Sequence, residues 1–153
     1  MLTNKGKYGL KAMVHLARLE AGRTAQSAEI AAAEHISKKF LDAILLDLRN
    51  GGFVRSKKGP GGGYALARDA SDIAVGAVVR ALDGPLAPIA CASRTAYQPC
   101  DDCDDLAGCA VRLTMLEVRD AMAEVLDTLT LAEMARRSAP GEDPAPLGSD
   151  GRA

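Results

Sequence analysis

Aromatic residues are scarce in this sequence, and no stretch of it is both long and apolar. Aromatics make up 3% of the 153 residues and hydrophobic residues 48%, so the core is expected to consist of Leu, Val, Ile, Ala and Met. No apolar run approaches the roughly 20 residues that a membrane-spanning helix needs. The start of the chain has no hydrophobic segment typical of a signal peptide. We therefore expect a cytoplasmic protein with no membrane partner.

The sequence also lacks the marks of a familiar enzyme. We find no cofactor fingerprint, no acid–base pair and no internal repeat. The one glycine-rich run, residues 58–63, is not followed by a helix whose N-terminus could hold a phosphate. We therefore expect that the protein is not an enzyme. A redox enzyme or an electron carrier is kept as an alternative class of function.

The net charge of −1 hides a strong asymmetry along the chain. Residues 1–68 carry 12 Lys+Arg against 5 Asp+Glu, a balance of +7, whereas residues 69–153 carry 7 against 15, a balance of −8. A basic front half suggests a polyanionic partner. A chance segregation of solvated charges would give the same balance.

The first part of the chain has the layout of a helix-turn-helix. An apolar stripe at helical spacing predicts a helix over Lys5–Glu20. Ser27 is placed to cap a short helix over Ala28–Glu34, and Ser37 to cap a second one that ends at the two glycines 51–52. The second helix would present polar residues of its first turns to DNA bases. Any two-helix hairpin could look similar.

A basic hairpin follows directly. Strands are predicted over Phe53–Lys57 and Tyr64–Ala67, joined by the glycine-rich residues 58–63. The dense positive charge on this hairpin is typical of the wing of a winged helix, which contacts phosphates or a minor groove. A further helix is predicted over Asp69–Asp83.

A regular apolar pattern predicts one long helix from about Cys109 to Leu129. Its seam alternates steps of four and three, the a/d pattern of a coiled coil, at Val111, Met115, Val118, Met122, Val125 and Leu129. We expect this helix to pair two chains; the alternative is a helix packed only on its own domain. Thr130 and Glu133 have the spacing of a capping box for a short last helix.

These features divide the chain into four parts. Residues 1–84 form the predicted winged-helix DNA-binding domain and residues 85–109 a cysteine-rich loop. Residues 110–138 form the dimerisation helix and the short last helix, and residues 139–153 are expected to be disordered. The predicted fold class is mainly α with a small β-hairpin wing.

All four cysteines lie within one stretch of the chain, at Cys91, Cys100, Cys103 and Cys109. Four thiolates so close in sequence suit one tetrahedral metal site or one iron–sulfur cluster. A structural zinc site often uses two CxxC pairs, and only one is present, which favours a cluster. Zinc, disulfides and unliganded thiols stay open. Acidic residues around Cys103 work against a low thiol pKa, which disfavours a catalytic cysteine.

On these residues the chain resembles the Rrf2 family of bacterial transcription regulators, over about residues 1–137. The resemblance rests on residues 28–54, on the wing sequence KKGPGGGYAL (57–66), on DIAVGAVVRALDG (72–84), and on the cysteine loop and long helix that follow. It implies a dimeric winged-helix DNA-binding protein with crossed long helices. It also implies a [2Fe-2S] or [4Fe-4S] cluster held by three loop cysteines and a fourth ligand that differs between branches.

Two departures from the family concern that fourth ligand. Arg112 stands where the cluster-biogenesis regulator has a histidine ligand, and Lys7-Tyr8 stands where the nitric-oxide branch has an acidic one. Cys91, Cys103 and Cys109 match the family's three cysteines, and the extra Cys100 could supply a fourth thiolate. We therefore predict an all-cysteine site, with zinc as the alternative metal.

The resemblance also places the DNA contacts. Lys39, Asp42 and Ala43 fall on the base-reading face, and Lys58 falls at the wing residue. The full set of predicted DNA-binding residues lies on the second helix and the wing: Ser37, Lys38, Lys39, Asp42, Arg55, Lys57, Lys58, Gly61 and Tyr64.

The predicted function is a homodimeric transcription regulator of a pseudo-palindromic operator. Its DNA affinity would be set by an iron–sulfur cluster that senses iron, redox state or nitric oxide. The alternative is a winged-helix regulator with a structural zinc or a thiol-based switch and no cluster.

Overall fold

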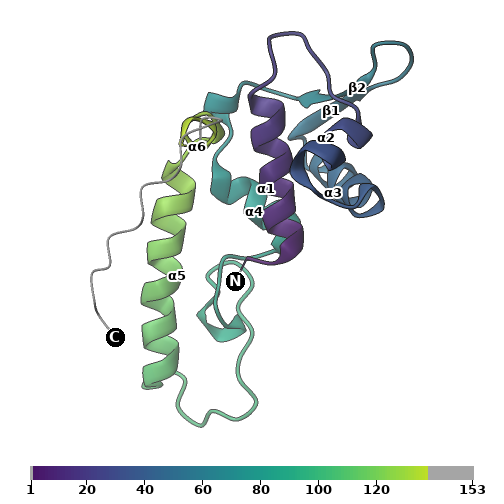
Figure 1. Ribbon diagram of the computed structural model, residues 1–153. Helices are drawn as coiled ribbons and strands as arrows, with labels where there is room; N and C mark the ends of the chain where they lie inside the picture. The colour runs from purple at the N-terminus through teal and green to yellow at the C-terminus, as the bar shows by residue number, and fades with distance from the viewer. Residues whose placement is uncertain (1, 138–153) are drawn as a thin grey trace, which may run out of the picture.

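Six α-helices, one hairpin and two short 3-10 turns follow one another along residues 2–137, the part of the chain that the computed structural model describes (Figure 1). The elements are α1 (Asn4–Ala17), α2 (Ser27–Glu34), α3 (Lys38–Asn50), β1 (Val54–Lys57), β2 (Gly63–Leu66), η1 (Ala70–Asp72), α4 (Val75–Asp83), η2 (Ala90–Ala92), α5 (Ala110–Thr128) and α6 (Leu131–Arg136). The predicted fold class, mainly α with a β-hairpin wing, is confirmed. The tail of residues 139–153, predicted to be disordered, lies outside the described residues.

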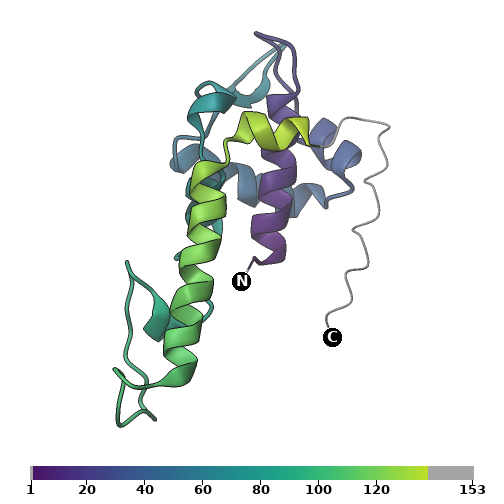
Figure 2. The same cartoon turned by 90° about the vertical axis from the view of Figure 1, so that its left-hand side faces the viewer.

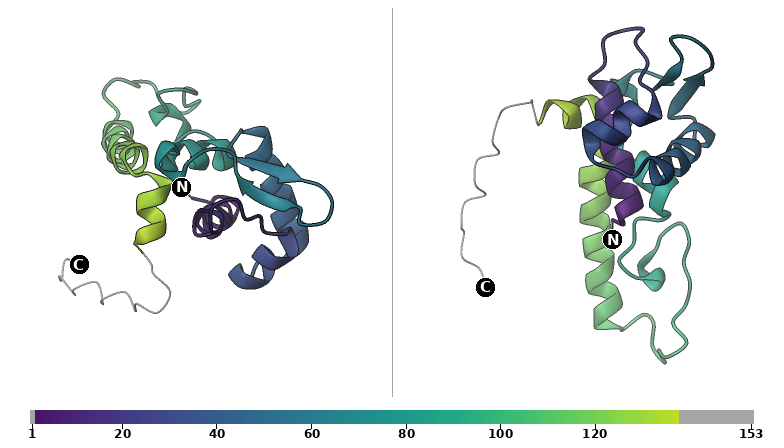
Figure 3. Two further views of the ribbon diagram at one scale, coloured as in Figure 1. Left: turned by 90° about the horizontal axis from the view of Figure 1, so that it is seen from above. Right: turned by 45° about the vertical axis from the view of Figure 1, so that its right-hand side comes forward.

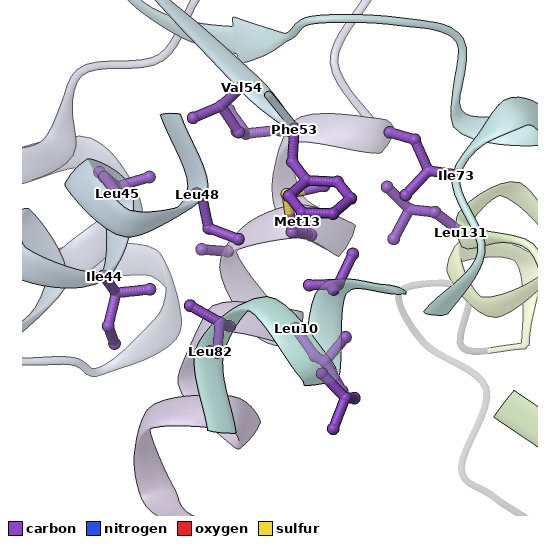
Figure 4. Close-up of a cluster of buried hydrophobic side chains, with 14 of the residues drawn as sticks. Leu10, Met13, Ile44, Leu45, Leu48, Phe53, Val54, Ile73, Leu82 and Leu131 are labelled. Carbon is purple, nitrogen blue, oxygen red and sulfur yellow. The ribbon is translucent and has the colours of Figure 1, made fainter. Parts of the chain in front are cut away.

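The core forms where α1 meets α3, α4 and α6 (Figure 4). Met13 of α1 and Leu45 and Leu48 of α3 are fully buried there. Gly9 lets α1 and α4 approach closely, because a Cβ at this position would lie 2.1 Å from a methyl carbon of Leu82. Burying each such Leu or Met side chain contributes roughly 1.5–3 kcal/mol. No described helix is long and apolar enough to cross a bilayer.

The helix-turn-helix consists of α2 and α3. The turn between them contains His35 in the left-handed region, with φ 54°. The Ser37 hydroxyl accepts a hydrogen bond from the Phe40 amide at 3.2 Å, so the predicted cap of α3 is confirmed. The predicted cap at Ser27 is wrong: α2 begins at Ser27 itself, because the Gln26 carbonyl already accepts from the Ile30 amide at 3.1 Å.

The hairpin is antiparallel, with Val54 opposite Leu66 and Lys57 opposite Gly63. Gly63 has φ 145°, and a Cβ there would lie 2.6 Å from the Ala25 carbonyl oxygen. This close approach lets Tyr64 exchange two backbone hydrogen bonds with Ala25, of 2.7 and 2.9 Å. The glycine-rich sequence thus fixes the wing against the segment that leads into α2.

The helix predicted over Asp69–Asp83 is wrong over residues 69–74, because α4 begins at Val75. Asp69 accepts a hydrogen bond from the Ser71 amide and closes the short turn η1 instead. The next residues are extended because Ala74 pairs with Thr130 across the molecule. The Val75 amide donates to Leu129 at 2.9 Å, and the helix begins only there. The first helix likewise ends at Ala17 rather than Glu20.

Helix α5 extends away from the winged-helix body, with the cysteine loop at its far end (Figure 2). Its C-terminal end is tied to α4 by Arg80, which binds the Asp127 carboxylate through both guanidinium Nη atoms. Short α6 follows and packs against α1. Seen from above, α5 and the loop lie on one side of α1, and the hairpin and α3 on the other (Figure 3).

Candidate DNA interface and cysteine site

The predicted base-reading residues lie on the exposed N-terminal turns of α3. Lys38 and Asp42 form an ion pair of 2.9 Å one helical turn apart, and this bond holds the pKa of Asp42 below its usual value. Lys39 is exposed beside them. The three side chains therefore offer donors and an acceptor in one small area, as base edges require.

The wing presents its charges on an exposed hairpin. Lys57 and Lys58 are exposed at the end of β1 and in the tip, and the Thr24 hydroxyl donates to the Gly61 carbonyl at 3.0 Å. Tyr64 is half-buried and packs against the core. The structure therefore places Tyr64 at the base of the wing and the lysines toward its tip.

Two basic residues near the wing were not among the predicted contacts. Arg23 and Arg68 line, together with Arg55, a groove between the C-terminal end of α1 and the base of the hairpin. The guanidinium carbon of Arg68 lies 5.4 Å from the centre of the Phe53 ring. The local sequence gives no sign of this grouping, because the three arginines come from separate segments.

The structure brings the four cysteines together in one series. Cys91 is buried in η2, and its thiol lies close enough to that of Cys100 for Cys100 to raise the pKa of Cys91. Cys100 interacts in turn with Cys103, and Cys103 with Cys109. Cys109 also caps α5, because its Sγ accepts a hydrogen bond from the Arg112 amide at 3.5 Å. One thiol series thus runs from η2 to the first turn of the long helix.

Not all of these thiols are equally close. Cys100 and Cys103, with the carboxylate of Asp102, offer ligand atoms that all lie within 4.8 Å of one another. Cys91 and Cys109 extend this group at its two ends. Asp102, one of the acidic residues around Cys103, is a third potential ligand.

The pKa values of Cys91, Cys100 and Cys103 are all raised. The hydrogen bond with Cys100 and burial raise the pKa of Cys91. Hydrogen bonds with Cys91 and with Cys100 lower the pKa values of Cys100 and Cys103 respectively, but burial and the neighbouring thiols outweigh them, so both end raised. A bound cation would offset this mutual repulsion and displace the protons. The donor set therefore fits a thiolate-held metal or cluster.

Two arginines near this site, Arg94 and Arg112, form hydrogen bonds that the sequence did not predict. The Arg112 side chain donates to backbone carbonyls on both limbs of the loop. Arg94 binds the Asp120 carboxylate of α5 with two hydrogen bonds, one of them 2.8 Å from Nε. Arg94 and Arg119 hold the pKa of Asp120 well below its usual range. The loop and α5 are thus linked by ionised side chains.

Half of the predicted apolar seam is exposed within the described chain, whereas Met115, Met122 and Leu129 are half-buried. Val111, Val118 and Val125 are 63%, 40% and 58% exposed, and Ala123 is the buried residue of this helix. A row of exposed valines on a 19-residue helix is the surface that a second helix would cover.

A helix-turn-helix followed by a basic hairpin defines a winged-helix DNA-binding protein. The family model for Rrf2, described as iron-dependent transcriptional regulator, matches residues 2–137. The chain belongs to the Rrf2 family of transcription regulators.

Individual relatives agree with this assignment. The chain is 46% identical over 138 residues to an rrf2-like HTH-type transcriptional regulator of Rhodobacter capsulatus, covering 88% of this chain and 91% of that one. It is 34% identical over 133 residues to the HTH-type transcriptional regulator IscR of Serratia proteamaculans, covering 87% and 77%. The solved structure of CymR, the global cysteine regulator of B. subtilis, superposes with a TM-score of 0.75 at 31% identity and covers 91% and 98%.

Proposed function

We propose that this chain is a homodimeric transcription regulator whose affinity for a pseudo-palindromic operator is set by an iron–sulfur cluster on Cys91, Cys100, Cys103 and Cys109. The observation that carries the proposal is the thiol series that ends at the cap of α5. The other end of this helix is bonded to the winged-helix body. The cysteine site is therefore connected to the DNA-binding surface through one rigid element.

The DNA-binding part would be residues 1–84. Ser37, Lys38, Lys39 and Asp42 would enter the major groove on the first turns of α3. Arg55, Lys57, Lys58 and Gly61 would bring the wing to the backbone or minor groove, with Tyr64 fixing its base. A lysine at the wing neutralises phosphate without the fork of an arginine, so readout there would rest on charge.

Dimerisation would use residues 110–138. Pairing two copies of α5 through Val111, Val118 and Val125 would remove three exposed apolar side chains per chain from water. A two-fold pair of this kind presents two recognition helices to two half-sites. The spacing between those helices then depends on how the paired α5 helices cross.

The loop of residues 85–109 would supply the cluster ligands. An iron–sulfur cluster, when bound, contributes a group whose retention depends on iron, redox state and nitric oxide. Cys91 would fix the site to η2 and Cys109 to the first turn of α5, while Cys100 and Cys103 span the gap. When all four thiolates are engaged, the loop is ordered against α5 and the crossing of the helices is fixed. Release of the thiols relaxes that constraint.

The family assignment supports the DNA-binding part, but the relatives point to more than one kind of cysteine site. The family description names iron dependence, and the Serratia relative is an IscR. The B. subtilis relative CymR is a global cysteine regulator, so a thiol-based switch without a cluster is the rival within the family. A structural zinc is the other rival.

An anaerobic preparation separates these possibilities. Visible absorbance with matched iron and sulfide is the expected result, and the iron count per chain distinguishes [2Fe-2S] from [4Fe-4S]. Colourless protein with one zinc per chain, or without metal, would contradict the cluster. A chain carrying Cys91→Ser, Cys103→Ser and Cys109→Ser should lose both the iron and the change in DNA affinity.

The DNA contacts can be tested through salt dependence. Lys58→Ala should weaken binding to duplex DNA and reduce the slope of log affinity against log salt by about 1, the value for one lost phosphate contact. Arg136→Ala is the control, because Arg136 is an exposed cation on α6, outside the proposed DNA-binding part. Equal slopes in the two variants would contradict the placement of Lys58 at the DNA.

A further inference from the structure

A single side chain joins both limbs of the cysteine loop to the long helix. Arg112, in the first turn of α5, donates from Nε to the Cys91 carbonyl at 2.9 Å. Its Nη1 donates to the Leu106 carbonyl at 3.4 Å, three residues before Cys109. Its guanidinium carbon also lies 5.8 Å from the centre of the Tyr97 ring. The same residue donates its backbone amide to the Cys109 thiol.

These contacts matter because few other side-chain hydrogen bonds join the described loop to α5. Within the loop, the Gln98 amide donates to Ala90 and the Asp105 carboxylate accepts from Ala107 and Gly108. Arg94 provides a further side-chain tie from the described loop to α5, through Asp120. That pair is exposed on both sides and does not touch a cysteine.

We propose that Arg112 is a positioning residue of the cysteine site, which clamps the limb carrying Cys91 against the limb carrying Cys109 and fixes both to the first turn of α5. This inference rests on the proposed function for the identity of the ligand group. This role needs a side chain that binds two carbonyls on separate limbs at once. A positive charge alone, or a single hydrogen-bond donor, cannot do this.

The chemistry of arginine explains why this residue type fits. A guanidinium is planar, always charged and donates in several fixed directions, so it can bind two carbonyls while lying near an aromatic ring. A lysine at the same position keeps the charge but has one ammonium group on a flexible stem. The positive charge also lies beside a site that becomes negative when its thiols ionise.

The test measures how often the Cys91 thiol is exposed. Cys91 is 3% exposed, so it reacts only when the loop opens locally. We would treat metal-free, reduced full-length chain with pulses of N-ethylmaleimide and measure the alkylation rate of each cysteine by peptide mass spectrometry. The variants are Arg112→Gln, Arg112→Lys and, as the matched control, Arg94→Gln. Circular dichroism melting verifies that each variant is folded.

The expected result is that Arg112→Gln speeds alkylation of Cys91 by roughly thirtyfold, because the two side-chain hydrogen bonds that hold the loop closed are lost. Arg112→Lys should do so to a similar extent, while Arg94→Gln should leave the Cys91 rate within about twofold of the wild type. An unchanged rate in Arg112→Gln would overturn the proposal. So would full rescue by lysine, which would reduce the role to charge, or an equal effect of Arg94→Gln.

A second readout applies to the loaded protein. After anaerobic reconstitution, Arg112→Gln should release iron to a chelator several times faster than Arg94→Gln. The two proposals fail separately: a wild-type chain that takes up no iron and sulfide overturns the proposed function, while the alkylation rates of the metal-free chain still decide the role of Arg112.

Discussion

The winged-helix body and the cysteine loop differ in the interactions that stabilise their conformations. In the body, fully buried aliphatic side chains such as Met13, Leu45 and Leu48 pack together from several elements. In the loop, residues 91–93 are buried where η2 packs on α5, but residues 94–99 are exposed, and the side-chain hydrogen bonds between the loop and α5 come from Arg94 and Arg112. A surface held by apolar burial keeps its shape whatever binds elsewhere, whereas a loop held by a few polar contacts responds to its ligands.

The strongest test of this contrast compares stability in the two regions. Leu45→Ala should lower the free energy of unfolding by about 3 kcal/mol, because a fully buried leucine leaves a cavity. Cys100→Ser in the metal-free chain should lower it by less than about 1 kcal/mol. Urea denaturation followed by circular dichroism measures both. A larger loss for Cys100→Ser would show that the loop, rather than the apolar core, stabilises the fold.

A second test concerns the exposed valines of α5, the helix that joins the cysteine loop to the body. Combining Val118→Asp with Val125→Asp would place two charges on the proposed pairing face of α5, so we expect the variant to sediment as a monomer and the wild type as a dimer. The melting temperature of the body should fall little.

The matched control for the seam is Glu117→Gln, which lies on α5 outside the seam. It should leave the dimer intact. A double-aspartate chain that still sediments as a dimer would contradict the proposed interface and require another face for the second copy.

The smallest expected effect concerns the joint between α5 and the body. The hydrogen bond with Arg80 lowers the pKa of Asp127 from its usual 3.8. A carboxyl with a lowered pKa in the folded chain adds stability above pH 3.8, and this stability is lost as the pH falls through the lowered pKa. Asp127→Asn should thus cost less than about 1 kcal/mol at pH 7, since the pair is partly exposed.

As the pH falls below 3.8 and through the lowered pKa of Asp127, the wild type and Asp127→Asn should converge in stability. Thermal melts from pH 7 to pH 2 provide the comparison. Arg80→Gln should show the same pH dependence, and the double variant should cost less than the sum of the two single ones. A difference that stays constant down to pH 2 would contradict a role for the ionised pair.

The sequence predicted those elements whose signals are local. The cap at Ser37, the glycine-rich hairpin and the long helix from Ala110 to Thr128 follow from capping, turn chemistry and apolar period. The division of Asp69–Asp83 was missed because it depends on pairing between Ala74 and Thr130, far apart in the chain.

The site was predicted to a similar extent. Clustering of the cysteines was visible in their spacing, although their order of contact was not. Arg112 stood out in the sequence only as a missing histidine ligand. Its bonds to Cys91 and Leu106 depend on how the loop folds back on α5, which no local pattern encodes.

The most direct measurement is the affinity of one DNA duplex, selected from a random pool, for the cluster-loaded and the metal-free dimer at the same salt concentration. Anaerobic fluorescence anisotropy should show affinities that differ by about tenfold or more, within the usual range of coupling between two sites. The Cys91, Cys103 and Cys109 triple serine variant should match the metal-free form. Equal affinities of the loaded and metal-free wild type would contradict control of DNA binding by the cysteine site.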